Sequence, residues 1–115
     1  ASNVRSLENV LDQLHNTGKT LLVSTHDIDF AWRWASRVLV LHDGALIADG
    51  APQKLLTNWT LLHKIGMEPP MLCQIVEALV ARGLLPETEH YPRDVGQLLH
   101  TLPEKQASPA PENVL

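Results

Sequence analysis

The residues best suited to chemistry follow a short apolar run in the first third of the chain. Leu21, Leu22 and Val23 form that run, and a His26-Asp27 pair comes shortly after it. An unbroken apolar run predicts a strand buried on both faces, as in a parallel α/β sheet. Open sheets of this kind place their ligand sites just beyond the carboxyl ends of the strands. His26 is therefore the main candidate for a functional side chain.

Two other interpretations of His26 remain open from the residues alone. The imidazole could close a turn by hydrogen bonding, which is a purely structural role. With Asp27 and Asp29 it could instead bind a divalent metal, because imidazole and carboxylate are common metal ligands. We do not favour the metal site, since an acidic residue early in a helix commonly complements the helix dipole. We expect Asp27, or else Asp29, to cap the helix that follows.

Other residues that often bind metals or cofactors are scattered along the chain. The remaining histidines are His15, His42, His63, His90 and His100. They lack the close pairing that metal sites show, so we expect no metal site in this chain. Trp32 and Trp34 lie two residues apart on the predicted helix, so they point in different directions and one should pack inward. Cys73, the one cysteine, excludes an internal disulfide and is expected to be at least half buried on its helix.

Hydrophobic periodicity and turn residues predict the elements that position His26. We expect a helix over about Val4 to Asn16, capped by Asn3 and ended by Gly18, and then a strand over Thr20 to Thr25. A short helix around Ile28 to Ala35 should follow. After it we expect a strand over Val38 to Leu41, a return strand around Leu46 and Ile47, and a helix opened by Pro52. The Asp43-Gly44 pair predicts a hairpin with a type I′ turn.

The second part of the chain, from residue 66 onward, is predicted to be mainly helical. Residues 66–70 break the pattern as a connector. An amphipathic helix follows over about Pro70 to Gly83, with its apolar stripe on Leu72, Ile75, Val76, Leu79 and Val80. A last short helix opens near Pro92. From Pro103 onward the composition is typical of disorder.

Three segments together resemble a known family. They are LLVSTHD at 21–27, SRVLVLHDGALIADG at 36–50 and the A-P-x-x-L-L run at 51–56. In this order and spacing they resemble the C-terminal part of an ATP-binding cassette (ABC) transporter ATPase. The residues after Met67 are most like the cobalt/nickel, energy-coupling-factor type of importer. The resemblance implies that His26 is the switch histidine, which reaches the γ-phosphate of bound ATP.

The family's other motifs do not occur in the sequence. No G-x-x-x-x-G-K-[ST] loop, no apolar run ending in Asp-Glu and no signature Ser-Gly-Gly stretch occurs. We therefore interpret the chain as a fragment that carries a latent switch histidine and is inactive alone. ATP and Mg²⁺ are the cofactors that the resemblance implies for a complete subunit, and we expect this chain by itself to bind neither.

The expected fold class follows from the same resemblance. It is α/β, with a partial P-loop NTPase-like sheet, flanking helices and a small helical extension. We divide the chain into residues 1–66 as the nucleotide-binding part, 67–102 as the helical extension and 103–115 as a disordered tail. Because the neighbouring strands are missing, the predicted strand at residues 20–25 leaves an open apolar edge. We expect a marginally folded chain that tends to aggregate.

Composition limits the classes of partner. A net charge of −4 without a basic cluster argues against nucleic acid. No apolar run is long enough to span a bilayer. The resemblance implies a second nucleotide-binding subunit and transmembrane subunits as partners, at the inner face of the cell membrane. The competing hypothesis is a non-catalytic interaction or regulatory module that keeps part of the cassette fold.

Overall fold

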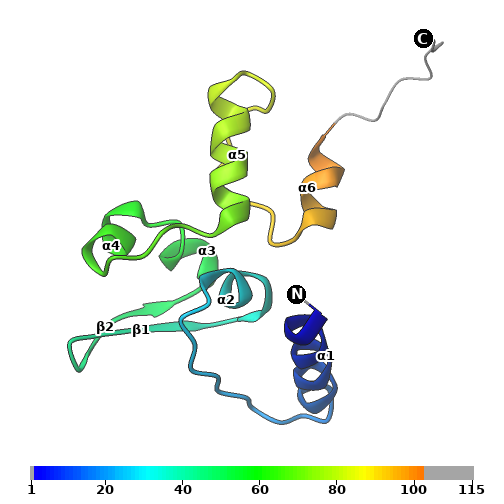
Figure 1. The fold of residues 1–115 in the computed structure, drawn as a ribbon, viewed down its shortest axis with the longest axis vertical. Helices are drawn as coiled ribbons and strands as arrows, with labels where there is room; N and C mark the ends of the chain where they lie inside the picture. The colour runs from blue at the N-terminus through cyan, green and yellow to red at the C-terminus, as the bar shows by residue number, and fades with distance from the viewer. Residues whose placement is uncertain (1, 103–115) are drawn as a thin grey trace, which may run out of the picture.

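The computed structural model describes residues 2–102, with side chains from Leu7 onward, so the tail predicted to be disordered lies outside the described residues. Along the chain the elements are α1 (Ser2–Asn16), α2 (Ile28–Trp34), β1 (Val38–His42), β2 (Ala45–Gly50), α3 (Pro52–Leu55), α4 (Trp59–Lys64), α5 (Met71–Ala81) and α6 (Val95–Thr101). Figure 1 shows the hairpin at one end, with α5 and α6 at the other and α2 and α3 between them.

Helix α1 matches its predicted span apart from its start. It already begins at Ser2, so Asn3 lies inside the helix and is not its cap. Gly18 ends it as predicted, because its amide donates to the carbonyl of His15 at 2.9 Å while its φ is +87°. The apolar side chains of Leu7, Val10 and Leu14 are exposed, and no side chain of this helix from Leu7 onward is buried.

The strand predicted over Thr20 to Thr25 is wrong. This segment has no strand structure, and the Leu22 side chain is 88% exposed. A strand needs a neighbour for its backbone hydrogen bonds. Within residues 2–102 the sheet contains β1 and β2 alone. The fold class is therefore mixed α/β with a two-stranded sheet, and the parallel P-loop-type sheet is not present in the described residues.

The β1-β2 hairpin forms as predicted. Asp43 and Gly44 both have positive φ, at 51° and 78°, which a type I′ turn requires. The strands pair antiparallel, and Leu41 lies opposite Leu46. Further from the turn the register shifts by one residue, which is a β-bulge. One face of β1 turns inward through Val40, whereas the other leaves Leu41 72% exposed.

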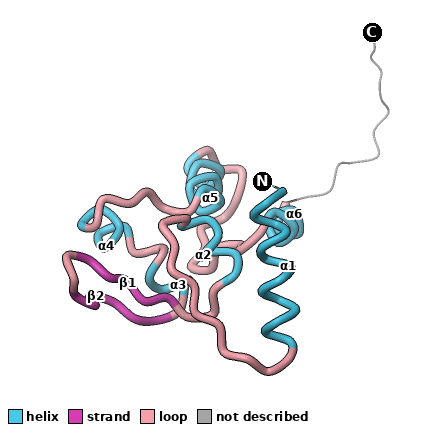
Figure 2. Tube along the Cα trace, turned by 60° about the horizontal axis from the view of Figure 1, so that its bottom comes forward, coloured by secondary structure: helices cyan, strands magenta, loops and turns pink. Residues whose placement is uncertain are grey.

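The core lies where α2, α4 and α5 meet the residues after α3. Its buried members are Trp32, Leu56, Leu62 and Cys73. Partly buried side chains packed around them come from both sides of the connector; they are Ile28, Ala31, Val38, Ile65, Met67 and Tyr91. Residues from 67–102, among them Cys73 of α5, therefore share one hydrophobic cluster with residues 28–65, and Figure 2 shows α5 above α2 in this arrangement.

Helix α5 covers the core with part of its predicted stripe. Val76 of that stripe is buried, together with Cys73, whereas Ile75, which was predicted to pack, is exposed. The helix ends in a Schellman motif, since the Leu84 amide donates to the carbonyl of Leu79 and Gly83 has a φ of +75°. None of the helices within residues 2–102 has the length and apolar character needed to cross a bilayer.

Candidate functional site

His26 lies on an exposed loop immediately before α2. The Thr25 hydroxyl accepts a hydrogen bond from the Asp27 amide at 2.9 Å, which folds the backbone tightly around His26. The Asp27 carboxylate then accepts from the Phe30 amide at 3.0 Å and caps α2. Of the two caps considered for this helix, Asp27 is the one that forms. The imidazole of His26 is exposed to solvent.

The two tryptophans of α2 point in different directions, as predicted. Trp32 is 1% exposed in the core, and its indole N–H donates to the carbonyl of Pro92 at 2.9 Å. Trp34 points toward α1, where its indole donates to Asp12 at 3.1 Å. Its ring also stacks on Phe30, with centroids 5.7 Å apart. Each tryptophan thus links α2 to a different part of the chain.

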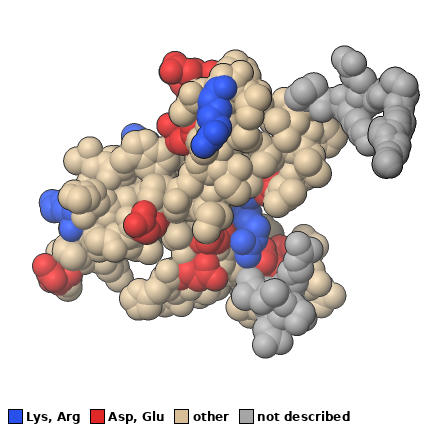
Figure 3. Space-filling model, turned by 45° about the horizontal axis from the view of Figure 1, so that its top comes forward, with Lys and Arg blue, Asp and Glu red and all other residues tan. Residues whose placement is uncertain are grey.

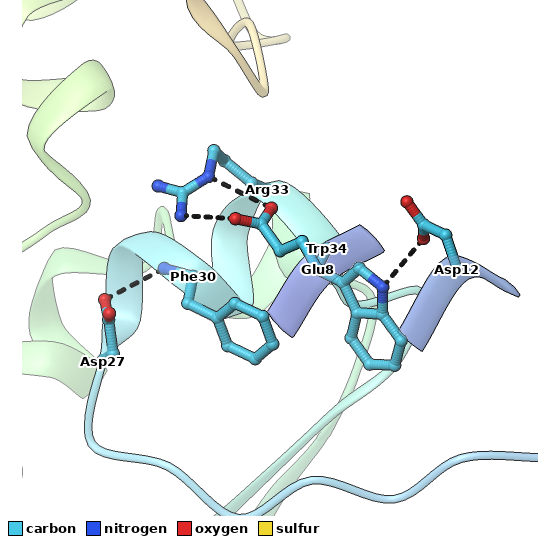
Figure 4. A network of polar contacts seen from close by, with 6 residues as sticks. All are labelled: Glu8, Asp12, Asp27, Phe30, Arg33 and Trp34. Atoms are coloured by element: carbon cyan, nitrogen blue, oxygen red, sulfur yellow. Dashed lines mark hydrogen bonds and ion pairs between the residues drawn. The ribbon is translucent and has the colours of Figure 1, made fainter. Parts of the chain in front are cut away.

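Helix α1 contacts α2 through polar side chains. The Arg33 guanidinium donates to both carboxylate oxygens of Glu8, at 3.4 and 3.1 Å, and Figure 4 shows this pair beside the Trp34–Asp12 bond. The bond to Glu8 raises the pKa of Arg33. Glu8 and Asp12 are four residues apart, so they lie on the same face of α1. These bonds attach α1 to α2 through exposed side chains.

Arg93, which lies far from α2 in the sequence, caps the C-terminal end of α2. Its Nε donates to the carbonyl of Trp32 at 2.8 Å, and its Nη2 donates to the carbonyl of Ala35. Carbonyls at the end of a helix lack partners within the helix, and a cation there also complements the helix dipole. Burial lowers the pKa of Arg93, which nevertheless stays charged because arginine is so basic. No local pattern around residue 93 could have predicted this contact.

Asp29 has a role that its sequence position did not reveal. It lies in the first turn of α2, where it was expected to complement the dipole of its own helix. Its carboxylate also accepts a hydrogen bond from the Met71 amide at 2.7 Å. Met71 is the first residue of α5, so Asp29 occupies one of the unpaired amides at the start of that helix.

Tyr91 fastens the connection between α5 and α6 to the rest of the chain. The side-chain amide of Gln53 donates to the Tyr91 carbonyl at 2.7 Å and accepts from the Tyr91 amide at 3.2 Å. The phenol donates to Glu77 on α5, and the ring lies edge-on to Trp59. Burial and the bond to Glu77 raise the pKa of Tyr91. This connection therefore joins α3, α4 and α5.

The remaining candidate groups are spread over the described part of the chain. Within residues 2–102 no three His, Cys, Asp or Glu side chains lie close enough to bind a metal ion. A surface pocket of about 450 Å³ lies between α4 and the connector, lined by Trp59, Leu62, His63, Gly66, Met67, Glu68 and Pro69, and it does not include the His26 loop. His42 contacts its neighbour Asp43 at 3.5 Å in the hairpin. On the face in Figure 3, basic side chains lie apart from one another, with acidic ones between them.

Comparison with known proteins gives a consistent set of relatives. No model of a protein family matches the chain. An "Energy-coupling factor transporter ATP-binding protein EcfA" from Carboxydothermus hydrogenoformans is 44% identical over 68 residues, which are 59% of this chain and 25% of that protein. An EcfA2 protein of the same description from Methanospirillum hungatei is 33% identical over 75 residues, 65% of this chain and 19% of that protein.

A third relative is a putative ABC transporter ATP-binding protein from Methanosarcina acetivorans. It is 40% identical over 83 residues, which are 72% of this chain and 26% of that protein. The chain thus spans about a fifth to a quarter of the length of these three relatives. Over more than half of its residues, the chain is a homologue of ATP-binding proteins of ABC transporters, energy-coupling factor subunits among them.

Proposed function

We propose that this chain forms part of the ATP-binding subunit of an ABC transporter. The observation that carries the proposal is its 44% identity to an energy-coupling factor ATP-binding protein over a segment of 68 residues. The proposed activity is to couple ATP hydrolysis to the import of cobalt, nickel or a related micronutrient. The choice of cobalt, nickel or a related micronutrient is supported by the resemblance of the residues after Met67 to the cobalt/nickel, energy-coupling-factor type of importer.

His26 is the residue to which we assign the catalytic role. It is exposed, it directly precedes the capped N-terminus of α2, and it lies in the segment that resembles the switch-histidine loop. In a complete subunit its imidazole would contact the terminal phosphate of ATP, where positioning and charge stabilisation provide most of the catalysis. The sequence has no phosphate-binding loop of the G-x-x-x-x-G-K-[ST] type, and residues 2–102 have no cluster of metal ligands, so other parts of the subunit would supply the contacts to ATP and Mg²⁺.

The proposed partners are a second nucleotide-binding subunit and the transmembrane subunits of the transporter. Their arrangement would place this chain on the cytoplasmic side of the membrane. The relatives described as energy-coupling factor transporter proteins support this assignment, because a transporter needs a membrane component.

Substitution of His26 in a complete, ATP-hydrolysing subunit tests the function. We expect His26→Ala to lower kcat by about a hundredfold or more, because one positioned acid–base or polar group typically contributes this much. Nucleotide affinity should stay nearly unchanged. His63→Ala, on exposed α4 surface, is the matched control. Unchanged turnover in His26→Ala would refute the switch assignment and favour the non-catalytic interaction module.

A further inference from the structure

Both ends of α2 are held by residues from the second part of the chain. At its start, Asp29 accepts from the amide of Met71 at 2.7 Å. At its end, Arg93 donates to the carbonyls of Trp32 and Ala35. Between them, the Trp32 indole donates to the Pro92 carbonyl at 2.9 Å. We name these contacts the α2 clamp.

The clamp matters because α2 has little stability of its own. It contains seven residues, far fewer than a helix needs to persist alone in water. Its polar contacts with α1 are the Trp34–Asp12 bond, between exposed groups, and the Arg33–Glu8 pair, whose arginine side chain is 35% exposed. Exposed ion pairs contribute little, whereas a charged donor bonded to two helix-end carbonyls in a half-buried place contributes more. The clamp and the burial of Trp32 therefore determine the position of α2.

The position of α2 determines in turn the position of His26. Asp27 is both the residue after His26 and the cap of α2, so the loop is tied to the helix by its backbone and by a side-chain bond. A shift or fraying of α2 would carry the imidazole with it. The His26 loop and the helices of residues 67–102 are thus coupled through one short helix.

We propose that Asp29 and Arg93 are positioning residues, through which whatever binds or moves residues 67–102 regulates the His26 loop. The regulatory consequence rests on the role proposed for His26, whereas the mechanical coupling does not. A partner that pulled α5 or the Tyr91–Arg93 segment away would release α2, and one that held them in place would keep His26 aligned. Hydrogen exchange reports on the coupling, whereas the rate of ATP hydrolysis reports on the function.

Amide hydrogen exchange on the full 115-residue chain tests the coupling. The reporters are the amides of Ala31 and Ala35, which bond to the carbonyls of Asp27 and Ala31 within α2. Arg93→Ala removes the donor from the carbonyls at the end of α2, and Asp29→Ala breaks the link between α2 and the start of α5. Both should therefore speed the exchange of these two amides by about fivefold or more. Amides in the second half of α5 should keep their rates. Arg82→Ala, an exposed arginine just after α5, is the control and should change nothing.

Conservative variants keep this test decisive if an alanine variant unfolds. Asp29→Asn retains an oxygen that can accept from Met71, so it should exchange nearly as slowly as the unaltered chain. Arg93→Lys can satisfy one of the two carbonyls and should be intermediate. Three results would overturn the proposal. The first is equal acceleration of exchange in α2 and α5 in Arg93→Lys, and the second is unchanged rates at Ala31 and Ala35 in both alanine variants. The third is an α2 that is already unprotected in the unaltered chain.

Kinetics in an ATP-hydrolysing subunit that contains this chain test the regulation. Arg93→Ala should lower kcat while the KM for ATP stays within about twofold, and Asp29→Asn should recover most of the activity lost in Asp29→Ala. Because the clamp acts through His26, the His26→Ala, Arg93→Ala double variant should be no slower than His26→Ala alone. If hydrolysis requires His26 but ignores Arg93, the regulatory inference fails. If exchange behaves as expected but His26 is dispensable, the clamp stands and the proposed function fails.

Discussion

The indole of Trp32 bonds to the carbonyl of Pro92 across sixty residues of chain. Trp32 is almost completely buried, and its N–H would cost free energy if it had no partner. Pro92 itself is buried beside it. Together with the bonds of Arg93, this contact attaches the segment between α5 and α6 to the helix that follows the His26 loop.

Replacing Trp32 by phenylalanine should therefore destabilise the chain. The ring would still fill most of the site, but the buried Pro92 carbonyl would lose its donor. We expect the free energy of unfolding to fall by about 1–3 kcal/mol, as measured by urea denaturation. Trp59→Phe is the control, because Trp59 is partly exposed and contacts Tyr91 through its ring. Equal losses in the two variants would show that ring volume, and not the hydrogen bond, is what matters.

The chain alone should neither bind nor hydrolyse ATP. The sequence lacks a loop of the type that cradles phosphates, and the described residues hold no cluster suited to Mg²⁺. Isothermal calorimetry with Mg·ATP should give no heat of binding at micromolar concentrations. A micromolar dissociation constant on pure, folded chain would contradict this expectation and point to a nucleotide site of another kind.

The exposed face of the hairpin should cause self-association. Leu41 and Leu46 lie opposite each other on the outer face, and both side chains are more than half exposed. Exposed apolar strands invite aggregation. The Leu41→Thr, Leu46→Thr double variant should remain monomeric at higher concentration in light scattering, with its thermal stability nearly unchanged.

Leu62→Ala, in the core, should instead lower the free energy of unfolding by about 2–5 kcal/mol. A sharp, reversible melt of a monodisperse unaltered chain would disprove the expectation of marginal folding.

Stability should decline at alkaline pH because of Cys73. Burial, together with the charges of Asp29 and Glu77, raises the pKa of its thiol to about 12. An unfolded thiol has a pKa of about 8.5. The folded pKa is the higher one, so the contribution is fully present below about pH 8.5 and is lost as the pH rises toward about 12. The urea midpoint should fall between pH 8 and pH 10.5, and it should fall less in Cys73→Ala. Parallel losses in both proteins would exclude the thiol as the cause.

Local signals in the sequence predicted the local structure well. Asp43-Gly44 specified the turn because few residue pairs adopt positive φ at both positions, and Gly18 ended α1 for a similar reason. The strand at residues 20–25 failed because strand formation depends on a neighbour that the described residues do not provide. An apolar run shows what could be buried, but it does not show what will cover it.

The candidate site divides in the same way. Asp27 could be predicted as a cap because its partner, Phe30, is three residues away. Arg93 could not be predicted, because its partners are 61 and 58 residues distant and only the packing of α2 brings them together. The switch role of His26 came from the resemblance to a family and stays a prediction, since an exposed imidazole before a helix has no unique chemistry.

The reciprocal pairing of Gln53 with Tyr91 has a consequence for how such proteins can diverge or be recombined. A side-chain amide here does what a neighbouring strand does elsewhere: it pairs with both backbone groups of one residue. Residues 67–102 are therefore not an independent module that can be exchanged between relatives at the Gly66 connector. A chimera that takes residues 67–102 from another protein keeps Gln53, Asp29 and Trp32, whose partners there are backbone groups. The donor segment must therefore place its backbone in the same way at positions 71, 91 and 92, and it must supply an arginine at 93.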